Sequence, residues 1–456
     1  MRWNKTKIVA TLGPASNDNK TLAELLLAGV DVVRINGAHG TTDEHIKTML
    51  RVRAISKKLK LPTAISIDLP GPKFRIGKLN TEPLILKKAS TVILDCKTTF
   101  QKGSSIPVPH NIHKSVKTGN SIFINDGMVE LRVIKIAGTR IHCKVISGGE
   151  IRSHKGLNLP GTKLKTPLLT ALDKKILNLA VEQGADYIAL SFVRSARDII
   201  RLRKLIRRRA PKMGIIAKIE KPEALDDLDN IIGVSDAIMV ARGDLGIELS
   251  FDQIPIVQKD ILRRCLKAGK PSITATQMLE SMVEKASPTR AEATDVANAV
   301  WDGTDAVMLS EETSIGKNPI SAITAMARIA FEAEKKMSPL YTGCICDEQS
   351  YAQAQVLCQA ACRIADELGA KAIVTPTRSG KTALLTSMNR PSVPILAPTE
   401  DALVARKMNL YWGVQPMTLP TFSTVDELLS RAEKAAIKSG FIKNGDTIVI
   451  TSGATG

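Results

Sequence analysis

The stretch IIAKIEKPEALDDLDNIIGVSDAIMVARGD, residues Ile215–Asp244, holds two short apolar runs with a helical pattern between them. We predict buried strands at Ile215–Glu220 and Ala237–Ala241, because short apolar runs bounded by turn residues are typical of parallel sheets. A strand, a helix and another strand in succession form the β/α unit of such sheets. The charged residues that end both runs therefore fall at one edge of the sheet.

The same unit recurs on both sides of this stretch. Helical patterns such as Lys20–Leu27 and Ala291–Ala299 follow other short β-like runs. With eight such runs, the sequence predicts an α/β fold of the (β/α)8 TIM-barrel type. The other six strands are expected at Lys7–Leu12, Val30–Asn36, Ala64–Leu69, Tyr187–Phe192, Ser272–Thr276 and Ala306–Ser310.

The alternation is interrupted once and later restarts. From Pro72 to Thr162 the sequence has short strand patterns and Gly, Asn and Asp turns, with no long amphipathic helix, which predicts a small all-β domain inserted after the third strand. Past Met337 helices and strands resume as a separate three-layer α/β domain. We therefore expect a barrel domain of residues 1–71 and 163–337, an inserted domain of residues 72–162 and a C-terminal domain of residues 338–456.

The chain of 456 residues carries a net charge of +19. Part of it is the run RLRKLIRRR, Arg201–Arg209, which raises the question of nucleic-acid binding. Aromatic residues make up only 3% of the chain, and Leu202, Leu205 and Ile206 fit one helical face. An amphipathic helix with a solvated basic face is therefore favoured, and we expect no nucleic-acid partner. A positive field still favours anionic substrates.

No apolar run has the length of a membrane span, and the first residues lack the pattern of a signal peptide. We expect a cytoplasmic protein with no membrane partner. The odd number of cysteines argues against a disulfide framework. Reduced, packed thiols are favoured over a metal site, because no histidine lies near the grouped cysteines. The cysteines are Cys96, Cys143, Cys265, Cys344, Cys346, Cys358 and Cys362.

Polar residues stand near the C-terminal ends of the predicted barrel strands, where barrel enzymes assemble their active sites. One such residue could serve a local cap or salt bridge, but a whole set at one rim indicates a site. The set consists of Arg34 and Asn36 on the second strand, Asp68 on the third, Lys218 and Glu220 on the fifth, Asp244 after the sixth and Thr276 on the seventh.

Glu220 and Asp244 come from neighbouring strands and can share a magnesium ion, which takes few protein carboxylates and fills its other positions with substrate oxygens and water. Alternation along the strand puts Lys218 on the same side as Glu220. Arg34 adds a planar cation suited to phosphate or carboxylate. This combination favours phosphoryl transfer, with Lys218, Thr276 or a water as proton donor.

The backbone of Ala241-Arg242-Gly243-Asp244 permits close approach, so its amides are candidates for holding a substrate carboxylate. The candidate substrate-binding residues are Arg34, Lys218, Ala241, Arg242, Gly243, Asp244 and Thr276.

Several segments together resemble the pyruvate kinase family over essentially the whole chain. The most specific are IIAKIEKPEAL, MVARGDLG and ATQMLESM, and others include TKIVATLGPAS, VVRINGAHG and DLPGPKFRIG. The resemblance implies that the inserted domain is a lid, that the C-terminal domain is regulatory and that the chain forms a homotetramer. It implies transfer of the phosphoryl group of phosphoenolpyruvate to ADP, giving pyruvate and ATP.

The resemblance also implies residue roles. Glu220 and Asp244 would bind the catalytic magnesium, and a second magnesium would arrive with ADP. Lys218 and Arg34 would hold the phosphoryl group, and Thr276 would assist protonation of the enolpyruvate carbon. The implied nucleotide contacts are Pro14, Asn36, His39, Arg75 and Lys155.

One departure concerns potassium, which many family members need beside the substrate phosphate. The corresponding positions keep Asn36 and Asp68, but Ala38 and Leu69 replace residues with side-chain oxygens. Lys73 stands where potassium-dependent members carry Glu. We predict that potassium is not required, because the Lys73 ammonium substitutes for it. The alternative is that Lys73 points to solvent and potassium binds through backbone carbonyls.

A second departure is the end of the chain at Gly456, because relatives continue through a loop that helps to enclose an effector phosphate. The other half of that site resembles TPTRSGKT, with amides at a helix start that suit a phosphorylated effector. A P-loop is rejected, because Thr375 stands where its first Gly is required. The candidate residues are Thr375, Thr377, Arg378, Ser379, Gly380, Lys381 and Thr382.

Two other functions are compatible with parts of the sequence. A barrel enzyme acting on phosphoenolpyruvate or a related 2-oxo acid without ADP would not need His39, Arg75 and Lys155. A non-catalytic protein binding anions or nucleic acid would bind DNA in a salt-dependent way and would not need Glu220.

Overall fold

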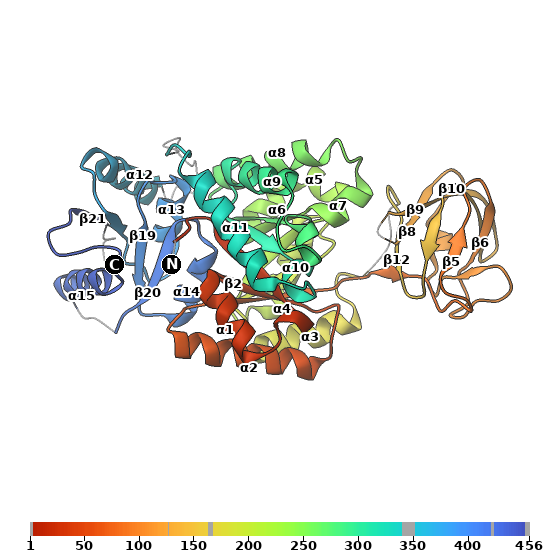
Figure 1. Cartoon of the computed structure of the whole chain (residues 1–456), viewed down its shortest axis with the longest axis horizontal. Coiled ribbons are helices and arrows are strands. Elements are labelled where there is room, and N and C mark those ends of the chain that lie inside the picture. The colour runs from red at the N-terminus through yellow and green to blue at the C-terminus, as the bar shows by residue number, and fades with distance from the viewer. Residues whose placement is uncertain (1–2, 126, 163–166, 340–351, 421–423, 452–456) are drawn as a thin grey trace.

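The computed structural model describes residues 3–125, 127–162, 167–339, 352–420 and 424–451. Three bodies lie in a row in Figure 1: the C-terminal domain, the barrel and the inserted domain. No helix in these ranges is both long enough and apolar enough to cross a membrane.

The central body is a closed barrel of eight parallel strands, which confirms the predicted TIM barrel. Strand β1 pairs with both β2 and β17 and so closes the ring. The strands are almost wholly buried, as expected of parallel strands covered by helices. Their bounds are β1 Lys7–Leu12, β2 Val32–Asn36, β3 Ala64–Leu69, β13 Tyr187–Leu190, β14 Gly214–Ile219, β15 Ala237–Ala241, β16 Ser272–Ala275 and β17 Ala306–Leu309.

Helices surround the barrel, as Figure 1 shows. Capping boxes begin three of them, at Thr41, Thr170 and Thr289, where an acidic residue three positions later bonds back to the cap. The helices are α1 Asn19–Ala28, α2 Thr42–Leu59, α3 Ala171–Glu182, α4 Ala196–Ile206, α6 Leu228–Val234, α8 Ile254–Lys267, α9 Arg290–Trp301 and α11 Pro319–Glu334.

Helix α4 contains most of the basic run. Ile199, Leu202 and Ile206 are buried in the barrel core, but Leu205 is 58% exposed. The expectation that Leu205 shares the apolar face was wrong, because the packed stripe of Ile199, Leu202 and Ile206 follows i, i+3, i+7 spacing, and Leu205 at i+6 lies outside it.

The inserted domain, called the lid below, contains nine short strands and a core of its own. Its main sheet has the order β4-β12-β8-β9-β10-β6-β7, and β11 pairs with β5. In Figure 1 a thin segment between β3 and β4 joins the barrel to the lid. The strands are β4 Phe74–Arg75, β5 Leu84–Leu86, β6 Thr91–Asp95, β7 Ile106–Pro107, β8 Ser121–Ile124, β9 Val129–Ala137, β10 Arg140–Ser147, β11 Gly149–Ile151 and β12 Gly156–Asn158.

The C-terminal domain has a parallel sheet of order β20-β19-β18-β21 with helices packed on it. Its β19 and β20 lie toward the barrel in Figure 1. Side chains from both bodies form one apolar cluster, in which Tyr187 and Ile216 of the barrel join Met408 and Val414. The elements are α12 Ala352–Glu367, β18 Ala372–Val374, α13 Lys381–Met388, β19 Ile395–Thr399, α14 Ala402–Lys407, β20 Val414–Thr418, α15 Val425–Lys438 and β21 Ile448–Ile450.

The cysteines that the structure describes are free and buried, and no group of metal-ligating side chains with three or more members occurs among the described residues. Burial raises the pKa of the Cys143 thiol to about 12. Cys344 and Cys346 lie outside the described residues.

Candidate active site

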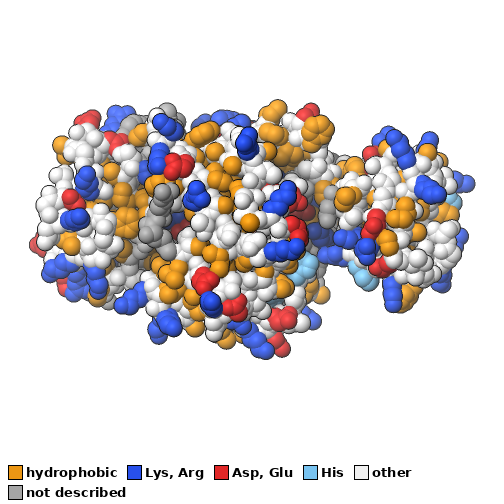
Figure 2. Space-filling model, viewed as in Figure 1, with side chains coloured by type: hydrophobic (Ala, Val, Ile, Leu, Met, Phe, Trp, Pro, Cys, Tyr) orange, Lys and Arg blue, Asp and Glu red, His pale blue; other side chains and the backbone are white. Residues whose placement is uncertain are grey.

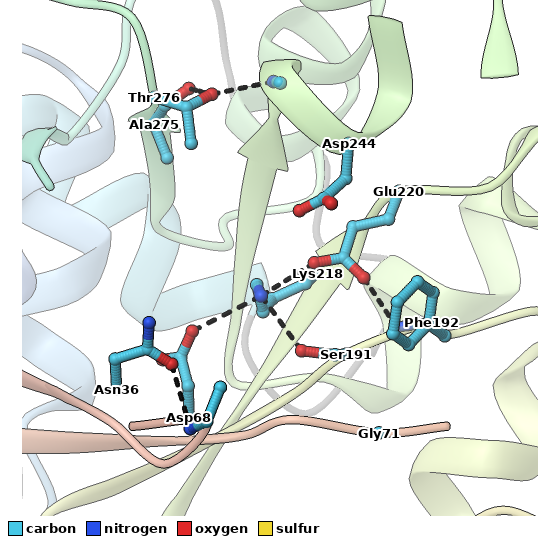
Figure 3. A network of polar contacts seen from close by, with 12 residues as sticks. Asn36, Asp68, Gly71, Ser191, Phe192, Lys218, Glu220, Asp244, Ala275 and Thr276 are labelled. Atoms are coloured by element: carbon cyan, nitrogen blue, oxygen red, sulfur yellow. Dashed lines mark hydrogen bonds and ion pairs between the residues drawn. The ribbon is translucent and has the colours of Figure 1, made fainter. Parts of the chain in front are cut away.

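The charged residues at the C-terminal ends of the barrel strands meet at one rim. Lys218 is on β14 and Glu220 directly follows it, so both side chains lie on the same side of the strand. Lys218 Nζ lies 2.6 Å from Glu220 Oε1 and 3.3 Å from Asp68 Oδ2, and it donates a hydrogen bond to Ser191 Oγ at 2.9 Å. Figure 3 shows this ammonium group between the three partners.

Arg34 on β2 completes a chain of alternating charges. Its Nη2 and Nε donate to Asp68 Oδ2 at 2.8 and 3.1 Å, and its Nη1 donates to Thr11 Oγ1 at 3.0 Å. One carboxylate oxygen of Asp68 thus faces two cations, which fixes the distance between them. The other oxygen, Oδ1, is buried and makes no hydrogen bond.

The pKa values of this cluster follow from burial and pairing. Burial alone would lower the pKa of Lys218, but the carboxylates of Glu220 and Asp68 outweigh it and raise that pKa above its ordinary value. Burial also acts to raise the pKa of Asp68, yet Arg34 and Lys218 hold it below its ordinary value. Lys218 therefore stays an ammonium group at neutral pH and acts as a fixed cation.

Glu220 and Asp244 fit a magnesium site of two protein carboxylates. Glu220 Oε2 accepts the Phe192 N–H at 2.7 Å, whereas the buried Oε1 is only in ionic contact with Lys218 and makes no hydrogen bond. Burial raises the pKa of Glu220, and the negative charge of Asp244 adds to this, although Lys218 opposes it. A carboxylate destabilised in this way gains from a divalent cation at Oε1, the oxygen that makes no hydrogen bond.

Thr276 directly follows β16 and faces the start of helix α7 (Arg242–Glu248). Its Oγ1 accepts the Gly243 N–H at 2.8 Å and donates to Ala275 O at 2.6 Å (Figure 3). The Gly243 amide expected to meet a substrate is thus bonded to Thr276 here. Ala241 is the buried last residue of β15. The Arg242 side chain is also buried and bonds protein groups, so a substrate contact there falls to its backbone.

Lys73 lies at the junction of barrel and lid. Its half-exposed ammonium is 3.9 Å from Asp244 Oδ1. Asn36 Oδ1 accepts the Ala38 N–H at 3.1 Å, and Leu69 is fully buried. The charge contact of Lys73 is therefore with Asp244, a candidate magnesium ligand, and not with Asp68, where a substitute for potassium was expected.

The residues expected at the nucleotide come from both the barrel and the lid. Pro14 begins the short helix Pro14–Ser16 after β1. Lys155 precedes β12, which pairs with the β4 strand of Arg75, and Arg75 Nη1 donates to His154 O at 2.9 Å. Burial lowers the pKa of His39, and the positive charges of Arg75, Lys73 and Arg34 lower it further. Figure 2 shows Lys, Arg and His side chains gathered at this junction.

The candidate effector loop precedes α13. Gly380 has φ +83°, and its N–H donates to Thr377 Oγ1 at 2.9 Å. The Lys381 N–H donates to Ser379 Oγ at 3.4 Å, and Arg378 and Ser379 are exposed. Thr375 is fully buried behind them, so its side chain does not reach the loop surface.

Comparisons with known proteins agree with this geometry. Residues 3–323 match the family model described as pyruvate kinase, barrel domain, and residues 355–456 match that described as pyruvate kinase, alpha/beta domain. The chain belongs to the pyruvate kinase family. It is accordingly a phosphotransferase.

Individual members of the pyruvate kinase family match along nearly the whole chain. A pyruvate kinase of Agrobacterium vitis is 44% identical, over 98% of this chain and 95% of the relative. One of Thermococcus litoralis is 39% identical, over 99% and 95%. The crystal structure of a pyruvate kinase from Cryptosporidium parvum superposes with a TM-score of 0.93 at 35% identity, covering 99% of this chain and 94% of that chain.

Sequence reasoning did not single out two polar side chains of this pyruvate kinase site, Ser191 and Thr11. Both face a cation of the cluster, Lys218 and Arg34 respectively. Ser191 directly follows the apolar strand β13, and that position at the rim was the available signal.

Proposed function

We propose that the chain transfers the phosphoryl group of phosphoenolpyruvate to ADP, giving pyruvate and ATP, with magnesium held by Glu220 and Asp244. The observation that carries the proposal is the position of Lys218 Nζ, which touches Glu220 on one side and Asp68 on the other. A fixed cation beside a divalent-metal carboxylate suits the charge that develops in phosphoryl transfer.

Each residue has a role in this proposal. Lys218 and Arg34 hold the transferring phosphoryl group, and Asp68 fixes the distance between their two charged groups. Bound magnesium supplies charge neutralisation on the phosphoryl oxygens, and a second magnesium arrives with ADP. Thr276 assists protonation of the enolpyruvate carbon. Pro14, Asn36, His39, Arg75 and Lys155 hold the nucleotide, and closure of the lid, residues 72–162, excludes water.

We further propose that catalysis does not require potassium. Ala38 and Leu69 offer no side-chain oxygens, and Lys73 brings a tethered positive charge to Asp244. This charge takes over the electrostatic task of a mobile cation, although it acts from the side of the metal site.

A homotetramer and a phosphorylated effector at residues 375–382 are also proposed. Exposed apolar side chains support self-association, since Val356 and Leu357 on α12 are 64% and 63% exposed. Light scattering of the purified chain tests the homotetramer directly, and a monomer at micromolar concentration contradicts it.

The catalytic proposal is tested with a lactate dehydrogenase-coupled assay containing phosphoenolpyruvate, ADP and magnesium. We expect Lys218→Met and Glu220→Ala to reduce kcat by about a hundredfold or more, because each removes charge compensation in a buried site. Lys174→Met, an exposed lysine of α3, serves as the control. An inactive parent contradicts the function, and an active Glu220→Ala variant contradicts the metal assignment.

A further inference from the structure

Thr276 has a backbone conformation that a threonine rarely adopts. Its φ is +66°, and Gln277 after it has φ +55°. A β-branched residue with positive φ is a genuine outlier, because its side chain collides with the backbone there. Such a conformation persists only where surrounding contacts fix it. The contacts that hold residues 275–277 therefore decide where the Thr276 hydroxyl lies.

The side chain of Arg242 supplies those contacts. Its Nη2 donates to Thr276 O at 2.7 Å, and its Nε is 3.3 Å from both Ala275 O and Thr276 O. Nη2 also lies 2.8 Å from Met278 Sδ. The guanidinium group thus binds the backbone carbonyls of Ala275 and Thr276, which lie on either side of the strained Cα atom.

The guanidinium is itself fixed from behind. Arg242 Nη1 donates to both carboxylate oxygens of Asp295 on α9, at 2.8 and 2.7 Å, and lies 3.3 Å from Gln258 Oε1 on α8. The Arg242 side chain is only 9% exposed. A rigid five-donor fork can meet the carbonyl and the carboxylate at once, which a lysine ammonium cannot do from one position.

The group that these contacts of Arg242 position, the Thr276 hydroxyl, faces the active site. While the Thr276 carbonyl is held by Arg242, its hydroxyl accepts the N–H of Gly243, the residue before Asp244. Figure 3 shows the Thr276 hydroxyl directed to the start of the helix that carries Asp244. The ends of β15 and β16 are therefore tied together by one side chain.

We propose that Arg242 is a positioning residue, which, braced by Asp295, holds Thr276 in its left-handed conformation so that the hydroxyl stays beside the reacting carbon. This inference rests on the proposed function, in which that carbon is protonated. It assigns the Arg242 side chain to Thr276 and not to the substrate.

The test follows proton transfer separately from ATP formation. Exchange of the pyruvate methyl hydrogens in D2O, followed by NMR, is measured for the parent, Arg242→Lys, Thr276→Val and the double variant. We expect each single variant to lower the exchange rate about tenfold or more. Because Arg242 acts through Thr276, the double variant should exchange no more slowly than Thr276→Val. If the reductions in exchange rate caused by the two single substitutions multiply in the double variant, the proposal is overturned, because Arg242 then acts by another route.

Two further variants and a structural readout complete the test. Asp295→Asn should reduce exchange in the same direction but less, whereas Arg264→Lys, which alters an ion pair of α8 with Asp260 and Asp229, should exchange like the parent. In a crystal structure of Arg242→Lys, we expect Thr276 to leave the positive φ region. Retention of φ near +66° in this variant overturns the proposed role of Arg242. If the parent forms no ATP, that result contradicts only the proposed function, and the φ of Thr276 still decides the role of Arg242.

Discussion

Arg390 and Asp305 form an ion pair between the C-terminal domain and the base of the barrel, and each side chain is only 1% exposed. Arg390 Nη1 donates to Asp305 Oδ1 at 2.9 Å, and Nη2 donates to Gly303 O at 2.7 Å. Asp305 Oδ2 in turn accepts the Ser272 N–H at the start of β16. One buried carboxylate thus orders a barrel strand and anchors the neighbouring domain.

We expect Asp305→Ala to lower the free energy of unfolding by about 3–5 kcal/mol, because it leaves the Arg390 charge buried without its carboxylate partner. Urea denaturation followed by tryptophan fluorescence measures this, since Trp412 lies 4.9 Å from the Arg390 guanidinium. Glu182→Ala, which breaks the exposed pair with Arg209, is the control and should cost less than about 1 kcal/mol. An equal loss in both variants contradicts a special role for the buried pair.

If Lys73 replaces potassium, then removing its positive charge should make the activity depend on potassium. The parent should have the same kcat in tetramethylammonium and potassium salts, because Lys73 provides the positive charge. Lys73→Glu should lose about tenfold in tetramethylammonium and recover in potassium, a difference of about 1.4 kcal/mol. Steady-state assays in the two salts measure this, with Lys73→Arg as the charge-conserving control. Strong potassium activation of the parent contradicts the proposal.

The barrel was predictable because its strands are short apolar runs with a repeated spacing, and burial of both faces requires that pattern. The ends of the individual strands were less predictable than the barrel itself. β2 begins at Val32 and not at Val30, because the Val30 N–H closes the end of α1 on Leu25 O. β16 ends at Ala275, because Thr276 takes a positive φ that no sequence pattern announced.

The rim of the barrel could be predicted from strand order alone, since parallel strands share one C-terminal edge. The direction of individual long side chains could not. Arg242 turns to Asp295 and Lys73 to Asp244, and both choices depend on partners distant in sequence. Neither periodicity nor composition carries information about such contacts.

Glu334 allows a prediction about pH. It accepts the N–H groups of Thr6 and Lys5 at 2.7 and 3.0 Å. Burial raises the pKa of its carboxyl, although these hydrogen bonds oppose the shift. The folded state then binds this proton more tightly than the unfolded state. The resulting stabilisation is complete below the ordinary carboxyl pKa and is lost as the pH rises through the raised value.

The free energy of unfolding of the parent, minus that of Glu334→Gln, should therefore fall as the pH rises above about 4.5. Urea denaturation of both proteins at a series of pH values measures the difference. A difference that grows with pH would mean that the buried carboxylate is favoured as an anion, contrary to the effect of burial.

The loop before α13 gives the last prediction. Its amides at Gly380 and Lys381 are bonded to the Thr377 and Ser379 side chains, so a phosphate must replace these weak caps at the helix start. A dianion there gains from the amides and the helix dipole. AMP or a sugar phosphate should therefore lower the concentration of phosphoenolpyruvate needed for half-maximal rate in the parent.

Ser379→Asp should remove most of that response, because it places a fixed negative charge where the phosphate binds. The coupled assay with and without each effector measures the change. Lys371→Glu, at the exposed residue before β18, is the control and should respond like the parent. If Ser379→Asp retains the full response, the effector binds elsewhere. A parent that responds to neither compound removes the basis for a phosphate site at this loop.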